Sequence, residues 1–252
     1  MSTPQFLLIP GFMCDASLWK FMLPGLQQLG QVHFADLNQG DSIENMAMRL
    51  LTDLPVNGVI VGFSLGGYVA RHLAWLAHQQ GISVRGLVLL NTSARASTLD
   101  EDNKNRQQIK LLTHYPYKGQ TLTALRRALH PQRQDDDIML AHLQAMSLSL
   151  GKQVFLQQLA IVRADGHHEL PDICCPSMIV ASRKDQMRRL DEAEKLARGL
   201  PHAELHIIED CGHMSPLEKA PELLQLLRTW LENQTFNDGF DVSNQILRAN
   251  SV

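Results

Sequence analysis

Short apolar runs alternate along the chain with longer stretches in which apolar residues recur at the helical period. The runs are aliphatic or β-branched, and residues typical of turns follow them: 6–9, 32–37, 58–62, 87–90, 178–181 and 205–208. Such continuous apolar runs are typical of parallel strands buried on both faces. Helical patterns follow four of the runs, at 42–53, 65–80, 190–199 and 220–233. The alternation predicts an α/β fold in which helices flank a mostly parallel central sheet.

Local signals mark the ends of two of these helices. Asp41 and Glu44 are spaced like a capping box, which predicts that the helix over 42–53 begins there. Gly81 directly follows the second helical pattern and is expected to end it as a C′ residue.

The stretch from 95 to 172 contains no clear strand but has helical patterns at 107–112 and 139–150. Because it lies between two strands of the sheet, we interpret it as a helical insertion, a cap, and not as a separate domain. The expected organisation is therefore a core of 1–94 and 173–233, a cap of 95–172 and a polar C-terminal tail of 234–252, to which no role is assigned.

A basic stretch within the insertion has no intervening acid and is bracketed by two acidic triplets, 100–102 and 135–137. It consists of Lys104, Arg106, Lys110, Lys118, Arg126, Arg127 and Arg133. One interpretation is a solvated helix face whose charge the flanking acids balance. The other is a surface that attracts an anionic substrate or an acidic partner protein.

The composition narrows the class of protein. The chain has 252 residues, of which 44% are hydrophobic and 19% charged. This suits one compact domain, which at such a length needs neither a metal nor a disulfide to be stable. The formal net charge of −3 gives no case for binding nucleic acid or an anionic membrane. We expect no cofactor and no metal.

The four cysteines, Cys14, Cys174, Cys175 and Cys211, form no zinc-like CxxC pair, so we expect reduced thiols. The sequence shows no secretory signal pattern, and the apolar run at 6–9 is too short to span a bilayer. The expected location is the cytoplasm.

Ser64 is the first candidate catalytic residue. It lies in the pattern Gly-x-Ser-x-Gly over 62–66, between the strand at 58–62 and the helix at 65–80. In this setting a strained turn exposes the serine hydroxyl, and the following helix directs its N-terminal amides at a developing oxyanion. Gly62 and Gly66 would allow neighbouring backbone to approach the turn closely. The alternative is a structural glycine-rich turn with a solvated serine.

A serine nucleophile needs a base, and His213 is the best candidate because it follows the last predicted strand, at the carboxyl edge where parallel sheets assemble sites. The other histidines considered are weaker: His72 and His78 lie on a helix, and His33 begins a strand. The segment His167-His168-Glu169 could suggest a metal, but neighbours on one extended segment rarely converge on one ion.

The base in turn needs an acid, and Asp185 follows the strand at 178–181 by a few residues. Asp210 is disfavoured, because a residue three positions from His213 on the same loop would struggle to face the imidazole Nδ1. The resulting chain order, Ser64, Asp185, His213, is the order of the nucleophile-elbow hydrolases.

These features together resemble the α/β-hydrolase superfamily over residues 5–95 and 175–232. Residues 7–12, with Trp19 downstream, resemble the family's strand that ends in His-Gly-aromatic, and 36–42 resemble a shortened Asp-x-x-Gly-x-Gly-x-Ser loop. The Ser64 elbow and the Gly212-His213 turn complete the resemblance. It implies an oxyanion hole made of the backbone amides of Phe12 and Leu65. Pro10 departs from the family's usual histidine, so the internal hydrogen bonding of that loop should differ.

Within the superfamily, the chain resembles the pimeloyl-carrier-protein methyl ester esterases, which implies a serine hydrolase of small carboxylic esters or related acyl compounds. The same resemblance makes an acidic carrier protein a candidate partner. Carbon–carbon bond hydrolases, lactonases and aminopeptidases with the same triad are similar at nearly the same level. A largely non-catalytic ligand-binding protein of this fold is the alternative from another class.

Overall fold

The computed structural model describes residues 3–234, so the expected tail lies outside the described residues except for Gln234. Six strands form one sheet in the order β2-β1-β3-β4-β5-β6, and every neighbouring pair is parallel. The strands are β1 (Gln5–Ile9), β2 (Gln31–Phe34), β3 (Gly58–Phe63), β4 (Val84–Leu90), β5 (Ser177–Ser182) and β6 (Ala203–Ile208).

The strand order reverses at one point of the sheet. The chain passes from β1 to β2 on one side and then returns to β3 on the other, so the order reverses between β1 and β3. Ile9 pairs with Gly62 and Phe63 with Leu90, which brings the carboxyl ends of these strands to the same edge. Ligands bind at such switch points in open α/β sheets.

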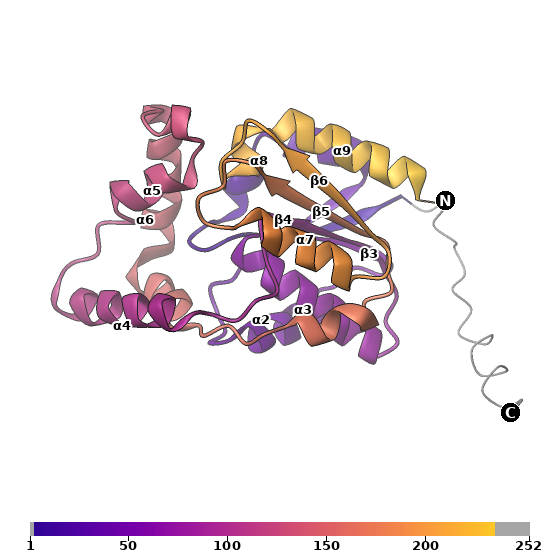
Figure 1. Ribbon diagram of the computed structural model, residues 1–252, viewed down its shortest axis with the longest axis horizontal. Helices are drawn as coiled ribbons and strands as arrows, with labels where there is room; N and C mark the ends of the chain where they lie inside the picture. Colours follow the sequence, from indigo (N-terminus) through magenta and orange to yellow (C-terminus); the bar gives the residue numbers. More distant parts are fainter. Residues whose placement is uncertain (1–2, 235–252) are drawn as a thin grey trace, which may run out of the picture.

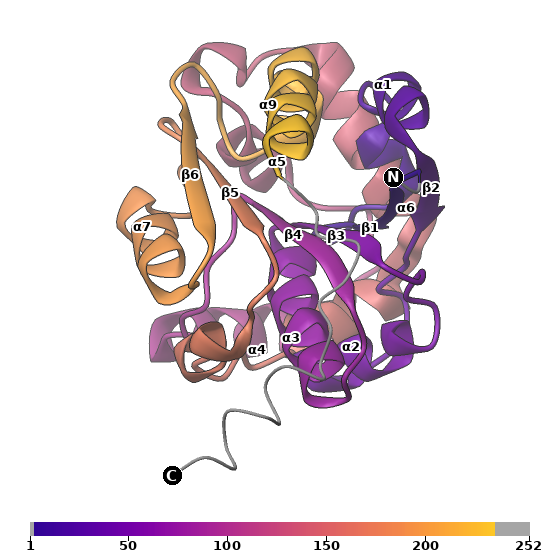
Figure 2. The ribbon, with the colours of Figure 1, turned by 90° about the vertical axis from the view of Figure 1, so that its right-hand side faces the viewer.

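Helices cover both faces of the sheet (Figures 1 and 2). One face packs on α1 (Leu23–Leu29) and α9 (Ala220–Asn233), and the other on α2 (Ile43–Leu51), α3 (Leu65–Gln79) and α7 (Leu190–Gly199). Because strand side chains alternate, Phe6 and Leu8 enter the first core while Leu7 and Ile9 enter the second. The sheet is therefore buried on both faces, as its apolar runs predict.

Between β4 and β5 the chain forms α4 (Leu99–His114), α5 (Leu122–Ala128), η2 (Pro131–Arg133), α6 (Asp137–Ala160) and η3 (His167–Asp172). Figure 1 shows α4, α5 and α6 standing to one side of the sheet. A small apolar cluster around Met13, Phe155 and Leu159 joins this segment to the loop after β1. No residue of α4 is fully buried, but Ile109 and Leu112 of this helix pack against the same cluster.

Two local predictions were wrong in detail. The helix α2 is capped by Ser42, whose hydroxyl accepts from the amide of Asn45 at 3.1 Å, and not by Asp41. The strand β2 ends at Phe34, three residues before the predicted end, because Asp36 accepts from the amide of Asn38 and turns the chain. Gly81 has φ +69° after α3, as expected of a helix-ending residue.

Two short helices complete the fold, η1 (Ala16–Trp19) and α8 (Ser215–Glu218). None of the helices in residues 3–234 combines the length and apolar character needed to cross a membrane.

Candidate active site

Ser64 occupies a strained turn between β3 and α3. Its φ of 52° and ψ of −112° lie outside the regions that L-residues ordinarily adopt. Three hydrogen bonds hold this turn: the Ser64 amide donates to Leu90 O at 2.9 Å, and Ser64 O accepts from the Gly67 amide at 3.0 Å and from Thr92 Oγ1 at 2.7 Å. The energy of the strained turn is thus offset by the adjacent strand β4 and the residues after it.

The two glycines of the elbow are required by close backbone approach, as predicted. A Cβ on Gly66 would lie 2.3 Å from Pro10 O and 2.4 Å from Ile9 O, and one on Gly62 would lie 2.5 Å from Gly66 O. The elbow is therefore packed directly against the end of β1, where the loop containing Phe12 begins.

His213 lies between Ser64 and Asp185, although the three residues are far apart in the chain. Its Nε2 is 2.9 Å from Ser64 Oγ, and its Nδ1 is 2.7 Å from Asp185 Oδ2. A carboxylate only accepts, so Nδ1 carries the proton and Nε2 is left to accept from the serine hydroxyl. The His213 side chain is buried and its ring packs against Phe63 at 5.1 Å between centroids. Asp210, the disfavoured acid, is exposed on the same loop.

Asp185 is held by several donors. Oδ1 accepts from the amides of Met187 at 2.7 Å and Arg188 at 2.9 Å, while Oδ2 accepts from Asn91 Nδ2 at 3.0 Å as well as from His213. Burial by itself raises the pKa of this carboxyl, but the charge and hydrogen bond of His213 and the other donors lower the pKa below its ordinary value. The carboxylate is therefore kept ionised beside the imidazole.

Asn91 was not predicted and links three segments at the carboxyl edge. Its Nδ2 donates to Ser182 Oγ at 2.9 Å in addition to Asp185, and its Oδ1 accepts from Ser215 Oγ at 2.5 Å. It adopts φ 47°, which asparagine tolerates better than most residues. The available signal was its position directly after β4, where polar residues meet the ends of β3 and β5.

The loop after β1 lies beside Ser64. A Cβ on Gly11 would lie 2.8 Å from the Phe63 ring and 3.3 Å from Ser64 Cβ. The loop turns back at Met13, which has φ 51°, and the Cys14 amide donates to Gly11 O at 3.1 Å. Leu65 is the first residue of α3, so its amide has no intrahelical acceptor. The two amides implied for an oxyanion hole thus belong to adjacent segments.

A family model described as the alpha/beta hydrolase family matches residues 6–225. The chain belongs to this family. The expected fold and the expected hydrolase class are therefore confirmed.

Curated relatives of this hydrolase are named after several different activities. It is 27% identical over 256 residues to a putative carbamate hydrolase of Stutzerimonas stutzeri, with 92% of each chain covered. It is 28% identical over 254 residues to a pimeloyl-[acyl-carrier protein] methyl ester esterase of Aromatoleum aromaticum, with 88% of this chain and 95% of the relative covered. Among solved structures, a thermophilic esterase from Thermogutta terrifontis aligns with a TM-score of 0.77 at 23% identity, covering 91% of this chain and 89% of that one.

The loop that carries His213 is attached to the end of α5. The amides of His213 and Met214 both donate to Ala128 O, at 2.9 and 3.2 Å. Glu218 bridges the same two segments, because its carboxylate accepts from the amides of His130 at 2.8 Å and Met214 at 3.1 Å. Burial raises the pKa of Glu218, and these amides oppose the rise.

Most of the basic stretch is paired or solvated. Arg126 pairs with Asp135 at 3.0 Å and Arg133 with Asp136 at 2.8 Å, as flanking acids predict. Arg127 instead donates to Gln186 O at 3.0 Å, which ties α5 to the loop that carries Asp185.

In the segment His167-His168-Glu169, the side chains of His167 and Glu169 bind other side chains of the protein. The buried Glu169 carboxylate pairs with Arg71 and accepts from His72 Nδ1 at 2.8 Å, while His167 binds Asp165. Within residues 3–234, no group of His, Cys, Asp and Glu is arranged to hold a metal ion.

All four cysteines are free thiols. Burial raises the pKa of the Cys14 thiol to about 12, with a further rise from the charge of Asp15. Burial likewise raises the pKa of Cys211 to about 12. Neither thiol has the lowered pKa of a cysteine nucleophile, although both lie on loops beside the site.

Proposed function

We propose that this protein hydrolyses a small carboxylic ester or related acyl compound through an acyl-enzyme formed on Ser64. The observation that carries the proposal is the continuous hydrogen-bonded line from Ser64 Oγ through His213 to Asp185, with links of 2.9 and 2.7 Å. A serine hydroxyl is a weak nucleophile, and a base within hydrogen-bonding distance is what activates it.

In the first half of the reaction, Ser64 Oγ attacks the carbonyl carbon while its proton passes to His213 Nε2. The Phe12 and Leu65 amides donate to the oxyanion of the tetrahedral intermediate. Asp185 holds the imidazole in the correct tautomer and stabilises its charged form. The intermediate collapses, the carbon–oxygen bond to the alcohol breaks, and His213 returns the proton to the leaving alcohol.

In the second half, a water molecule gives a proton to His213 and its oxygen attacks the acyl-enzyme carbonyl. The bond to Ser64 Oγ breaks, the carboxylic acid leaves, and the serine recovers its proton. No redox step or further reactant is needed.

The test is turnover of a panel of ester, thioester, lactone, carbamate and amide substrates together with fluorophosphonate labelling. We expect Ser64→Ala to abolish labelling and to lower kcat at least about 10⁴-fold. A wild-type protein that resists the probe and turns over no member of the panel would refute the proposal. Tight ligand binding unchanged in Ser64→Ala would instead support a binding protein.

We further propose α4 as the surface that would meet an acidic carrier protein if the acyl group is delivered on one. No residue of α4 is fully buried, and its basic residues include Lys104, Arg106 and Lys110. Replacing these three by glutamate should raise KM for a carrier-protein methyl ester more than KM for the free methyl ester. Equal effects on both substrates would exclude this partner. The free thiols suit a reducing compartment, and we propose the cytoplasm.

A further inference from the structure

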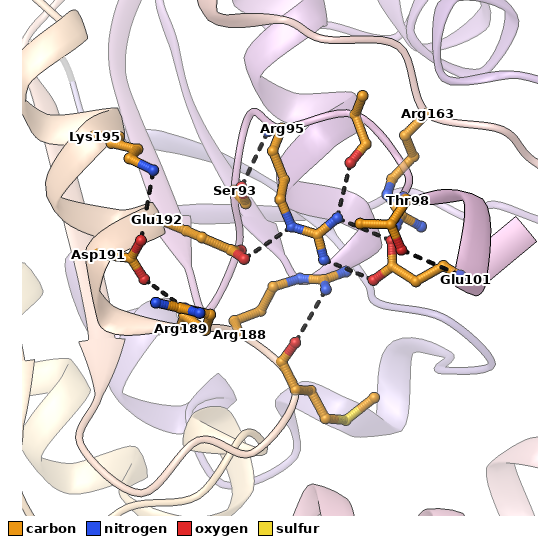
Figure 3. Close-up of polar contacts among 12 residues, drawn as sticks. Ser93, Arg95, Thr98, Glu101, Arg163, Arg188, Arg189, Asp191, Glu192 and Lys195 are labelled. Atoms are coloured by element: carbon orange, nitrogen blue, oxygen red, sulfur yellow. Dashed lines mark hydrogen bonds and ion pairs between the residues drawn. The ribbon is translucent and has the colours of Figure 1, made fainter.

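Five charged side chains gather where the segment between β4 and β5 joins the core (Figure 3). Arg95 binds both acids of the group: Nε donates to Glu192 at 2.8 Å and Nη2 to Glu101 at 2.6 Å. Arg163 also donates to Glu101, at 2.9 Å. The fifth member is Arg188, from the loop that follows Asp185. We call these residues the arginine cluster.

The arginine cluster has one more cation than it has acids. Arg95, Arg163 and Arg188 face two carboxylates, and both carboxylates are engaged by Arg95. Within residues 3–234, no carboxylate pairs with Arg188, whose side chain donates only to Met187 O at 3.1 Å. One positive charge at the core end of the cluster is therefore uncompensated.

Tyr68 lies beneath two of these arginines. The guanidinium carbons of Arg163 and Arg188 lie 5.3 and 5.6 Å from the centroid of its ring. The Tyr68 side chain is 1% exposed, and its hydroxyl is buried without a hydrogen-bond partner among the described residues. The Nε atoms of both arginines are buried and unpartnered as well. A buried donor without an acceptor costs free energy, and three such donors around one ring indicate a missing acceptor.

Tyr68 and Arg188 are adjacent to the proposed catalytic residues. Tyr68 follows Ser64 by four residues on α3, a rise of about 6 Å along the helix axis. The Arg188 amide donates to Asp185 Oδ1 at 2.9 Å, so the arginine is attached to the loop that orients His213. A group bound at Tyr68 and Arg188 would therefore be a few bonds away from a carbonyl at Ser64.

The geometry points to an anion subsite formed by Arg188, Arg163 and Tyr68, which takes a carboxylate carried by the ester substrate itself. The inference rests on the proposed function, because it names the substrate class of the same site. One uncompensated positive charge matches the single charge of a carboxylate better than it matches a phosphate dianion. The planar guanidinium groups also match the geometry of a carboxylate.

The test compares charged esters with their capped counterparts. Monomethyl glutarate and dimethyl glutarate place the charge on the acyl side, and acetoxybutyrate and its methyl ester place it on the alcohol side. We expect the wild type to prefer the charged member of at least one pair. Arg188→Gln should raise KM for that member about tenfold or more and leave the neutral member within about twofold.

Arg189→Gln is the matched control, because Arg189 is the next residue but is 80% exposed and pairs with Asp191. Arg189→Gln should leave KM unchanged for both members of a pair. Tyr68→Phe removes only the unpartnered hydroxyl and should lower the preference for the charged ester by a smaller factor. The inference would be overturned if Arg188→Gln changed KM equally for both esters of a pair. It would also be overturned if the wild type did not discriminate within either pair.

A second measurement separates this inference from the proposed function. Fluorophosphonate labelling and turnover of neutral esters report on Ser64 whether or not the subsite exists. Titration calorimetry with glutarate reports on the subsite whether or not the protein turns over esters. Binding by the wild type that Arg188→Gln loses and Arg189→Gln keeps supports the subsite. Binding that is absent, or equal in all three proteins, refutes it.

Discussion

The side-chain carbonyl of Gln158 accepts a hydrogen bond from the Met13 amide at 2.8 Å, which joins α6 to the loop beside Ser64. The same side chain donates from Nε2 to Leu37 O at 3.0 Å, so one buried amide connects three segments. Met13 has a positive φ, and a residue in that conformation persists only when its surroundings hold it. The position of the Phe12 amide thus depends on α6.

We expect Gln158→Leu to lower kcat by about tenfold or more with a smaller change in KM, because the Met13 amide would lose its acceptor and the Phe12 amide its fixed position. Steady-state kinetics on a neutral ester provide the measurement. Gln157→Leu is the control. Gln157 is the neighbouring residue of the same helix, but its side chain donates to Gly40 O and not to the loop after β1. A kcat that is unchanged in Gln158→Leu, or equally reduced in both variants, would show that α6 does not position the loop.

Replacing Asn91 by alanine should weaken the role proposed for Asp185. Asn91 donates to Asp185 Oδ2, and this bond helps to lower the pKa of Asp185 against the opposing effect of burial. Losing the bond raises that pKa, so the carboxylate is protonated at a higher pH. We expect kcat/KM to fall about tenfold or more, because the carboxylate that orients His213 would lose one of its donors.

Ser182→Ala is the comparison for Asn91→Ala, because it removes a partner of Asn91 and leaves the bond to Asp185 in place. It should lower kcat/KM less than Asn91→Ala does. If both variants lower kcat/KM equally, Asn91 acts on the fold of the site and not on Asp185.

Glu101 gives the protein an acid-dependent contribution to stability. Hydrogen bonds from Arg95, together with the Thr98 amide and the charge of Arg163, lower its pKa from 4.5 to about 2 against the effect of burial. Because the folded-state pKa is the lower one, this contribution is fully present above about pH 4.5 and is lost as the pH falls toward 2. Glu101→Gln should therefore be less stable than wild type at neutral pH, and the difference should shrink over that window. Urea unfolding across the pH range measures it, and a difference that does not depend on pH would contradict the assignment.

A methyl group at Gly66 should disrupt the elbow. The added Cβ would lie within 2.4 Å of the carbonyl oxygens of Ile9 and Pro10, and backbone atoms cannot move away as a flexible side chain can. We expect Gly66→Ala to lose activity and at least about 2 kcal/mol of stability in urea unfolding. Gly81→Ala, where φ is +69° and no atom lies within 4 Å, should cost only about 1 kcal/mol and keep activity. Equal losses in the two variants would show that contact with β1 is not the cause.

The sequence predicted the parts of the site that follow from strand ends. Ser64, Asp185 and His213 each come just after a run of apolar residues, and parallel strands bring such positions to one edge. Asn91 occupies an equivalent position after β4 but carries no motif, so it was overlooked. Gln158 could not be found this way, because its partners Met13 and Leu37 are more than a hundred residues distant and its helix shows no catalytic pattern.

The arginine cluster was beyond prediction for a different reason. The net charge of the basic stretch between 104 and 133 was visible in the sequence, and its flanking acids do pair with Arg126 and Arg133. Arg163 and Arg188, however, lie outside that stretch and meet only because the chain returns from α6 to the core beside α3. Hydrophobic periodicity predicts elements, and it does not specify which side chains meet between them.

Two contacts restrict how a substrate can enter: Ala128 O accepts from the amides of the His213 loop, and the His130 amide donates to Glu218. If α5 lifted away from the sheet, it would pull on the backbone of His213 and disturb its contact with Ser64. We therefore expect α5 to stay in place during turnover, so that substrate and product exchange without moving it (Figure 1). The site could then admit substrate without disturbing the contact between His213 and Ser64.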